Sequence, residues 1–505
     1  MFSTRLMTHA ATKLVSAIAL AGLASTASAD GTALTIYSTA SPGAIPPEMY
    51  RPTPGGTQYR NPWNQIPGYA MVKQEGTLNI KRGISEVSFL DVAALLDPTT
   101  VRFESLTDPD GTRVLEQDYR FDLLSMDKML ERYIDKEIIF GGQDMKLLSV
   151  AGGGMLLQAD DGRIKFQSGY NGVEFPSLAE GLITRPTLIW TLASDRQGPQ
   201  ESRITYQTGG ITWWADYNIL FHEGRDANSG TVDVGAWVSI LNQSGGSYDD
   251  ATLKLIAGDV NRAPQGGGGQ SPFQGREMMR SAVADAGFEE KAFFEYHLYT
   301  LGRPVTIPDR STKQIELFEA ARGVPAKKIL IYDGTSAFRN YGGRVDNQGV
   351  GAQSNAKVAV YLQFDNKDAD GLGIPLPSGR IRVSQTDDAD GSQEFIGEDI
   401  IDHTPKNEEV MIKIGNAFDV VGERRQVSFE RGKDWMIETI EVTLRNRKEE
   451  RVDVIVQEFL YRWTNANVQR ISHQQEMLDA RTMHIPVTLD PDEEEKVTYT
   501  VRYSW

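Results

Sequence analysis

The sequence LIWTL at residues 188–192 opens the stretch that decides the fold. Three similar runs follow it: RITYQTGGITWWADY at 203–217, VDVGAWVSI at 232–240 and ATLKLIAGDV at 251–260. Each run is rich in β-branched and aromatic residues, and Gly, Asn, Asp and Ser separate one run from the next. This pattern predicts consecutive antiparallel strands through the middle of the chain.

Alternation of apolar and polar residues continues to the C-terminus. In the last run, Val497, Tyr499, Val501 and Tyr503 alternate with polar residues. Such a period of two buries one face of a strand and leaves the other wet, as in antiparallel sandwiches. A short helix is expected at 126–138, where apolar residues recur at helical spacing. We therefore predict an all-β fold: several antiparallel β-sandwich or small-barrel domains with one or two short helices.

Composition divides the chain into five segments. They are a signal peptide at 1–29, a Pro/Gly-rich extended arm at 30–70, an N-terminal β domain at 71–185 with a small barrel at about 138–186, a central β domain at 186–330 with a flexible Gly-rich insertion at 262–290, and a C-terminal β-sandwich at 331–505. The prolines of the arm oppose a helix or a central strand. We expect the arm to lie on the surface or reach a partner; the alternative is a disordered leader.

The first residues have the form of an export signal. Arg5 and Lys13 supply positive charge before a short apolar run at 14–23. Small residues at 27–29 then provide a cleavage site after Ala29. That run is shorter than the roughly 20 residues that span a bilayer, and no later run is long enough. We expect cleavage after Ala29, a mature chain without a transmembrane segment, and a periplasmic or secreted location.

Charge and cysteine content exclude several classes of function. The formal net charge is −17, and so acidic a surface repels phosphate backbones, so we expect no nucleic-acid partner. An envelope protein or a glycan remains a possible partner, and the oligomeric state stays open. The chain has no Cys, which excludes a thiol nucleophile, a Cys-ligated metal and a lipid-modified cysteine.

The first candidate site is aromatic and consists of Trp213, Trp214 and Tyr217. Neighbouring strand residues point to opposite faces, so at most one of the two tryptophans faces a given core. The other is a candidate for stacking on a sugar ring. The alternative interpretation buries both, one in each of two packed layers.

The second candidate site is acidic and comprises Glu398, Asp399, Asp402 and His403. Carboxylates beside a histidine suit cation binding or general acid–base chemistry. The alternative is that these residues are strand ends around a polar turn. The histidines of the mature chain lack zinc-ligand spacing, so no zinc site is expected.

A third candidate concerns calcium. Residues 366–371 read NKDADG, which is similar to the first half of a calcium loop, with Asp368 and Asp370 as ligands. The twelfth position, where such a loop has Glu, is Pro377. An acidic hairpin turn is the alternative, and no other cofactor is expected.

Several motifs from residue 185 to the C-terminus resemble a known family of exported bacterial proteins. The motifs are ITWWADYN at 211–218, NQSG at 242–245, LKLIAGDV at 253–260, YHLYT at 296–300, PLPSG at 375–379, FIGED at 395–399, DHTP at 402–405, GNAFDVV at 415–421 and the closing YTVRYSW at 499–505. Together they are similar to the mucoidy-inhibitor-like proteins, which share a C-terminal β domain of unknown function. The resemblance implies an all-β domain outside the cytoplasm and no known activity.

Three functions follow as hypotheses. The leading one is an exported, non-catalytic envelope protein with a binding or structural role and an unknown ligand, because no recognisable catalytic set is present. The second is a carbohydrate-binding or carbohydrate-active envelope protein, which as an enzyme needs paired carboxylates in a cleft. The third is a calcium-stabilised surface protein.

Overall fold

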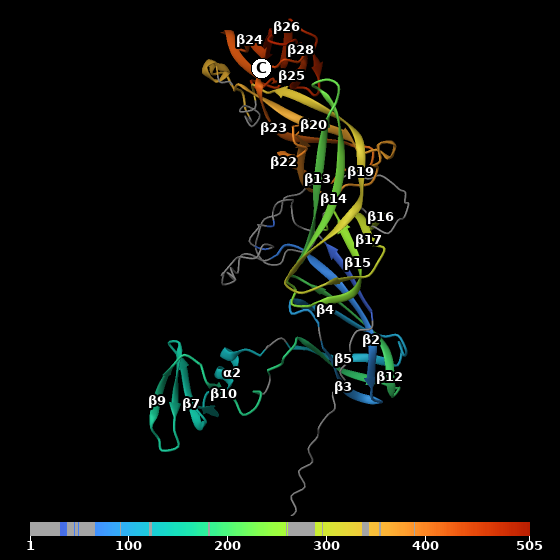
Figure 1. Ribbon diagram of the computed structural model, residues 1–505, viewed down its shortest axis with the longest axis vertical. Coiled ribbons are helices and arrows are strands. Elements are labelled where there is room, and N and C mark those ends of the chain that lie inside the picture. Colours follow the sequence, from blue (N-terminus) through green and yellow to red (C-terminus); the bar gives the residue numbers. More distant parts are fainter. Residues whose placement is uncertain are drawn as a thin grey trace, which may run out of the picture. The chain divides into compact units, whose positions relative to one another are not determined.

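The fold was obtained as a computed structural model. It describes residues 31–37, 45, 49, 66–90, 92–120, 124–179, 182–258, 260, 288–294, 296–335, 343–352, 355–387 and 389–505. Strands dominate these residues, so the predicted all-β class is confirmed (Figure 1). The expected signal peptide, most of the expected arm and nearly all of the Gly-rich insertion lie outside the described residues.

The chain forms two compact units. Unit 1 comprises residues 74–92 and 102–204, and unit 2 comprises 31–73, 93–101 and 205–505. This division differs from the segmentation expected from composition, which remains a prediction. Composition marks where turns are dense, whereas a unit is defined by which strands pack together.

Unit 1 contains a three-stranded antiparallel sheet in the order β3-β11-β5. Its strands are β3 (Gly83–Leu90), β5 (Thr112–Arg120) and β11 (Thr187–Ser194). The ring of Trp190 on β11 is buried against Phe89 and Phe103. Its indole Nε1 donates a hydrogen bond to the Gln117 side chain at 2.9 Å, which satisfies the one polar atom of this core residue.

Unit 1 also contains a five-stranded antiparallel sheet in the order β10-β6-β7-β8-β9. Its members are β6 (Glu137–Phe140), β7 (Gln143–Ala151), β8 (Gly154–Gln158), β9 (Ile164–Ser168) and β10 (Val173–Glu174). The ladder is open, with β10 and β9 at its edges, so the small barrel expected at 138–186 is not closed. Residues 141–142, 152–153 and 159–163 join neighbouring strands, but among the described residues no pairing of β9 with β10 closes the sheet.

A short helix, α2 (Met126–Arg132), covers one face of this sheet. Its Met129 and Leu130 are buried with Ile138, Leu147 and other apolar side chains of the sheet. The helix ends earlier than the apolar spacing predicts because Asp135 has a left-handed backbone. Ile138, expected on the helix, lies on β6.

An eight-stranded mixed sheet has the order β16-β17-β15-β1-β2-β12-β4, with β18 beside β15. Its strands are β1 (Gly31–Tyr37), β2 (Tyr69–Ile80), β4 (Leu96–Ser105), β12 (Gly198–Thr208), β15 (Tyr248–Ala257), β16 (Phe288–Phe293), β17 (Tyr296–Leu301) and β18 (Val305–Ile307).

The position of β1 corrects the expectation of a surface arm for residues 31–37. This strand pairs with β15 in parallel, and Leu34 and Ile36 are fully buried. The prolines that oppose a central strand begin only at Pro42. Before that point the alternation TALTIY is itself a strand pattern, which the composition of the whole segment conceals.

The largest sheet has thirteen strands. Ten of them run in the order β22-β21-β13-β14-β19-β20-β23-β24-β29-β26. These are β13 (Ile211–Glu223), β14 (Ser229–Asn242), β19 (Ser311–Tyr332), β20 (Lys357–Asp365), β21 (Gly379–Thr386), β22 (Gln393–Ile401), β23 (Glu409–Arg431), β24 (Trp435–Asn446), β26 (Ala466–Ile471) and β29 (Glu494–Ser504). Three further strands complete the sheet: β25 (Val452–Phe459), β27 (Glu476–Met477) and β28 (Thr482–Leu489). β25 pairs with β19, β28 pairs with β25, and β27 pairs with β28.

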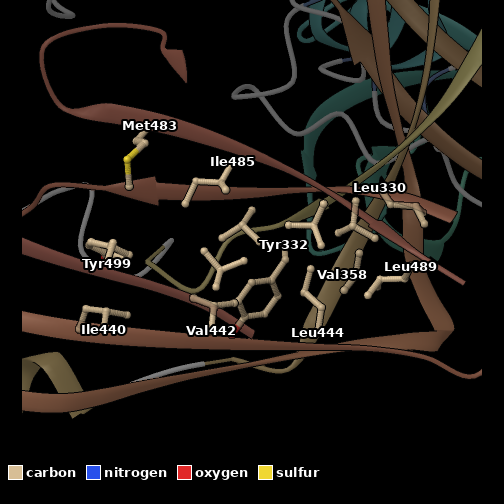
Figure 2. Close-up of a cluster of buried hydrophobic side chains, with 14 of the residues drawn as sticks. Leu330, Tyr332, Val358, Ile440, Val442, Leu444, Met483, Ile485, Leu489 and Tyr499 are labelled. Atoms are coloured by element: carbon tan, nitrogen blue, oxygen red, sulfur yellow. The ribbon is translucent and has the colours of Figure 1, made fainter. Parts of the chain in front are cut away.

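The C-terminal part of this sheet folds over an apolar core (Figure 2). Ile440 and Val442 on β24 and Met483 and Ile485 on β28 point into it and are fully buried. Burying one such side chain stabilises the fold by roughly 1.5–3 kcal/mol. The alternating sequence pattern of β20, β24 and β29 therefore reports burial correctly.

Among the residues that the structure describes, no helix has the length and apolar character needed to cross a membrane.

Candidate ligand-binding face

The two tryptophans of β13 lie on opposite faces of the sheet, as strand geometry requires. Trp213 is 1% exposed and packs edge-on against Tyr299 with ring centroids 6.4 Å apart. Tyr217, four residues further, is buried on the same side as Trp213. Trp213 and Tyr217 are therefore core residues, and only Trp214, which is half-buried, remains a stacking candidate.

Tyr217 and Tyr299 have a positioning role. Their hydroxyls donate hydrogen bonds to the carbonyl oxygens of Pro377 at 2.7 Å and Pro375 at 2.9 Å. Burial raises the pKa of both phenols well above the usual value, so both stay protonated and act as donors. They anchor the PLPSG segment that leads into β21.

Asp216 is the centre of a polar network on the opposite face of β13. Its Oδ2 accepts hydrogen bonds from the Trp214 indole at 2.7 Å and from the Ser239 hydroxyl at 2.9 Å. Its Oδ1 lies 3.4 Å from Nη1 of Arg382 on β21. Only 9% of Asp216 is exposed, so three neighbouring strands share one largely desolvated carboxylate. Charge-assisted bonds of this kind fix the orientation of the Trp214 ring.

Trp237 on β14 lies beside this network and is not among the residues predicted from the sequence. It stands directly across from Asp216 in the antiparallel register, and Glu316 on β19 is its partner on the other side. Directly opposed residues share a face and lie close together. Trp237 is 39% exposed, which is high for so large an apolar side chain inside a sheet. In the sequence, Trp237 alternates with apolar residues such as Val234 and Val238, which are buried. This alternation could have predicted that Trp237 lies on the solvent-exposed face of the strand.

Glu398 joins the same face from the next strand. It opposes Arg382 in the β21–β22 register, and its Oε2 lies 3.7 Å from the Arg382 Nε. Trp214 and Glu398 were predicted in separate candidate sites. They are linked because Arg382 lies beside both Glu398 and Asp216, and Asp216 bonds the Trp214 indole. We call this set the polar face: Trp214, Asp216, Trp237, Arg382 and Glu398.

Asp402 and His403 do not belong to the polar face. Both are exposed residues of the turn after β22. His403 Nδ1 accepts a hydrogen bond from the backbone N–H of Ser378 at 3.0 Å. The carbonyl of Asp402 accepts one from the Thr404 hydroxyl. The structure therefore separates these two residues from Glu398, and their contacts are those of a polar turn.

The calcium candidates lie in a short 3-10 turn, η3 (Asp368–Asp370), beside two lysines. The ammonium of Lys406 contacts the Asp368 carboxylate, and Lys367 lies 2.5 Å from Asp365. The Lys406 ammonium thus pairs with one of the two expected ligands, whereas Lys367 pairs with an acid outside that set. Within the described residues, no group of three or more His, Asp or Glu side chains is arranged to hold a metal ion.

A fully buried charge cluster occupies the C-terminal core and was not expected from the sequence. Arg424 Nε lies 3.1 Å from the Glu458 carboxylate, and Tyr499 donates to the same carboxylate at 2.7 Å. Arg462 Nε donates to Glu438 at 2.8 Å. Burial alone lowers the pKa of Arg424, but Glu458 and the surrounding acids and phenols raise it well above the usual value. The guanidinium stays charged, and its burial gives the cluster a structural role.

Comparison with known proteins adds no relative: no protein-family model matches the chain, and neither a curated protein nor a solved structure matches it. The chemistry of the polar face therefore rests on its own residues. Two indole rings, a guanidinium and two carboxylates on rigid strands supply stacking, donor and acceptor groups for a ligand. Hydrogen bonds to Asp216 hold the Trp214 ring and the Arg382 guanidinium in place before any ligand arrives, which limits the ordering cost of binding.

Proposed function

We propose that this protein is an exported, non-catalytic component of the bacterial envelope that binds a partner through the polar face. The signal-like leader and the resemblance to mucoidy-inhibitor-like proteins support a periplasmic or secreted location. The observation that carries the binding role is Trp237, a large aromatic side chain 39% exposed on a rigid central strand and opposite a desolvated carboxylate. Exposed aromatics of this kind are the usual anchors of binding surfaces.

The arrangement of carboxylates supports binding over hydrolysis. Asp216 and Glu398 are the two carboxylates of the polar face, and the Arg382 guanidinium lies within 3.7 Å of each. A glycosidase needs room between its two carboxyl groups for the scissile bond and, in inverting enzymes, for a water. Here a cation occupies that space, so both carboxylates act as partners of Arg382.

A glycan is the second candidate ligand, and the two tryptophans of the face favour it. Trp214 is held by its indole bond to Asp216, and Trp237 is offset from it by one diagonal step across β13 and β14. Diagonal neighbours in a sheet are about 7–8 Å apart, within the span of one sugar ring and its neighbour. Flanking carboxylate and guanidinium groups would bond the sugar hydroxyls.

Reversible cross-linking in the bacterial envelope tests the proposal. The full chain is cross-linked in the periplasmic fraction, recovered, and its adducts are compared with those of Trp237→Ala. We expect a defined adduct for the wild type and loss of most of it for the variant. Intrinsic tryptophan fluorescence of the purified chain, measured with added soluble oligosaccharides, distinguishes a glycan ligand from a protein ligand. If the ligand is a glycan, the oligosaccharides quench or shift the emission; if it is a protein, they leave the emission unchanged.

Phe418→Ala is the matched control for Trp237→Ala. Phe418 is an aromatic residue of β23 with 94% exposure, and it lies outside the polar face. Its variant should retain the adduct. Recovery of the wild-type chain without any adduct, together with unchanged fluorescence, contradicts a binding role.

A further inference from the structure

The outer edge of the five-stranded sheet in unit 1 has unused pairing capacity. β9 is the last strand of the order β10-β6-β7-β8-β9, and within the part of the chain that the structure describes it pairs with β8 alone. The flanking bonds Ala159 N to Arg163 O and Gly169 N to Gly153 O fix which residues face β8. Because hydrogen-bonded pairs alternate in an antiparallel ladder, Lys165 and Gln167 also bond to β8. The backbone groups of the even-numbered residues of β9 therefore point outward.

The side chains above this edge are apolar and exposed. Ile164 is 63% exposed and Phe166 is 61% exposed, and Leu156 stands directly opposite Phe166 on β8. The Phe166 ring lies over Gly154, where a Cβ would come within 2.7 Å of it, so the ring is held on the outer face. An exposed apolar edge strand is a template for pairing with another strand. No proline interrupts it.

From this geometry we propose that β9 pairs with β9 of a second copy of this chain, antiparallel and centred on Phe166. In that register Ile164 of one protomer faces Ser168 of its partner, and all three outward-pointing residues are paired. The outer face then carries a continuous apolar row from Leu156 through both Phe166 rings to the partner's Leu156. The proposal is independent of the function proposed for the polar face.

Charge limits the registers that this strand pair can adopt. Between Gly162 and Val173, Arg163 and Lys165 are the sole charged residues. Centring on Phe166 places Lys165 opposite the partner's Gln167 and Arg163 opposite the partner's Gly169. Centring on Ile164 or Lys165 would instead put two cations face to face, which destabilises a strand pair. Of the registers centred on Ile164, Lys165 or Phe166, the one centred on Phe166 therefore keeps the cations apart.

Sedimentation of the full chain over a range of concentrations tests the pairing. We expect a reversible dimer for the wild type and a monomer for Phe166→Lys, which places two cations on the symmetry axis. Phe418→Lys, at an even more exposed aromatic residue of β23, should still dimerise. A wild type that stays monomeric up to its solubility limit overturns the proposal, and so does a dimer that survives Phe166→Lys. Circular dichroism verifies that each variant is folded.

Disulfide trapping tests the register in a chain that has no cysteine of its own. Phe166→Cys brings two thiols onto paired residues, with Cα atoms about 5.5 Å apart, within disulfide reach. Ile164→Cys places its two thiols four residues out of register, about 13 Å apart along the strand. Rapid oxidation to a covalent dimer is expected for Phe166→Cys alone. Equal trapping of both variants contradicts the register.

Discussion

Arg424 and Glu458 form an ion pair in which both side chains are 0% exposed, with 3.1 Å between Nε and the carboxylate. Removing two charges from water is costly, and their attraction recovers this cost only when the remaining polar atoms are bonded. Tyr499 supplies one such bond. One residue along β23, Arg425 forms a pair with Glu441 at 2.7 Å, but its side chain is 64% exposed. The two pairs differ in solvent exposure on the same strand.

The first prediction concerns these two pairs. Arg424→Met should destabilise the protein by about 3–5 kcal/mol, because it leaves the Glu458 carboxylate buried without a counter-charge. Arg425→Met should cost about 1 kcal/mol or less, since water screens the exposed pair. Chemical denaturation of each variant measures the difference. Arg424→Met combined with Glu458→Leu should regain most of the loss, and failure to do so would show that packing dominates over charge.

The second prediction separates the buried tryptophan from the exposed one. Trp213→Ala should cost about 3–5 kcal/mol, because it opens a cavity beside Tyr299 in the core. Trp237→Ala should cost clearly less, since part of that ring already lies in water. Thermal unfolding of the two variants gives the comparison. Equal losses of stability would contradict the assignment of Trp213 to the core and Trp237 to a surface.

The third prediction concerns calcium. Neither added calcium nor a chelator should change the melting temperature, because the Lys406 ammonium already pairs with the Asp368 carboxylate. A ligand present at 100 times its Kd would stabilise the folded state by about 2.7 kcal/mol, which is easily detected. A rise in melting temperature with calcium that Asp368→Asn abolishes would restore the calcium hypothesis.

The fourth prediction concerns stability in acid. The carboxylate of Asp479 accepts the backbone N–H of Arg481 at 2.7 Å and of Thr482 at 2.8 Å, and these bonds lower its pKa below the usual 3.8. A lowered folded-state pKa means that the carboxylate stabilises the fold above pH 3.8 and loses this effect as the pH falls through the folded value. Asp479→Asn should therefore lower the melting temperature at pH 7. The difference from wild type should shrink below pH 3.8; a constant difference down to full protonation would contradict the assignment.

Local sequence patterns predicted much of the fold. The alternation of apolar and polar residues predicted the positions of β20, β24 and β29. It also predicted which side of each strand is buried, because the side-chain period of a strand is a property of the backbone itself. The same rule required Trp213 and Trp214 to face opposite ways. It failed for β1, where the prolines further along concealed a six-residue alternation from Thr32 to Tyr37. It also overextended α2, since a single left-handed residue, Asp135, ended the helix.

The sequence by itself determined that the chain is all-β, where most strands run and which residues share a face of one strand. Only the tertiary structure decided which of those faces is covered and which residues of distant strands meet. Asp216 and Arg382 are joined by a parallel pairing of β13 with β21, and Arg424 and Glu458 meet across the C-terminal core. Strand period is local, whereas register and burial depend on long-range packing, so the polar face and the buried charges appear only when the sheets are assembled.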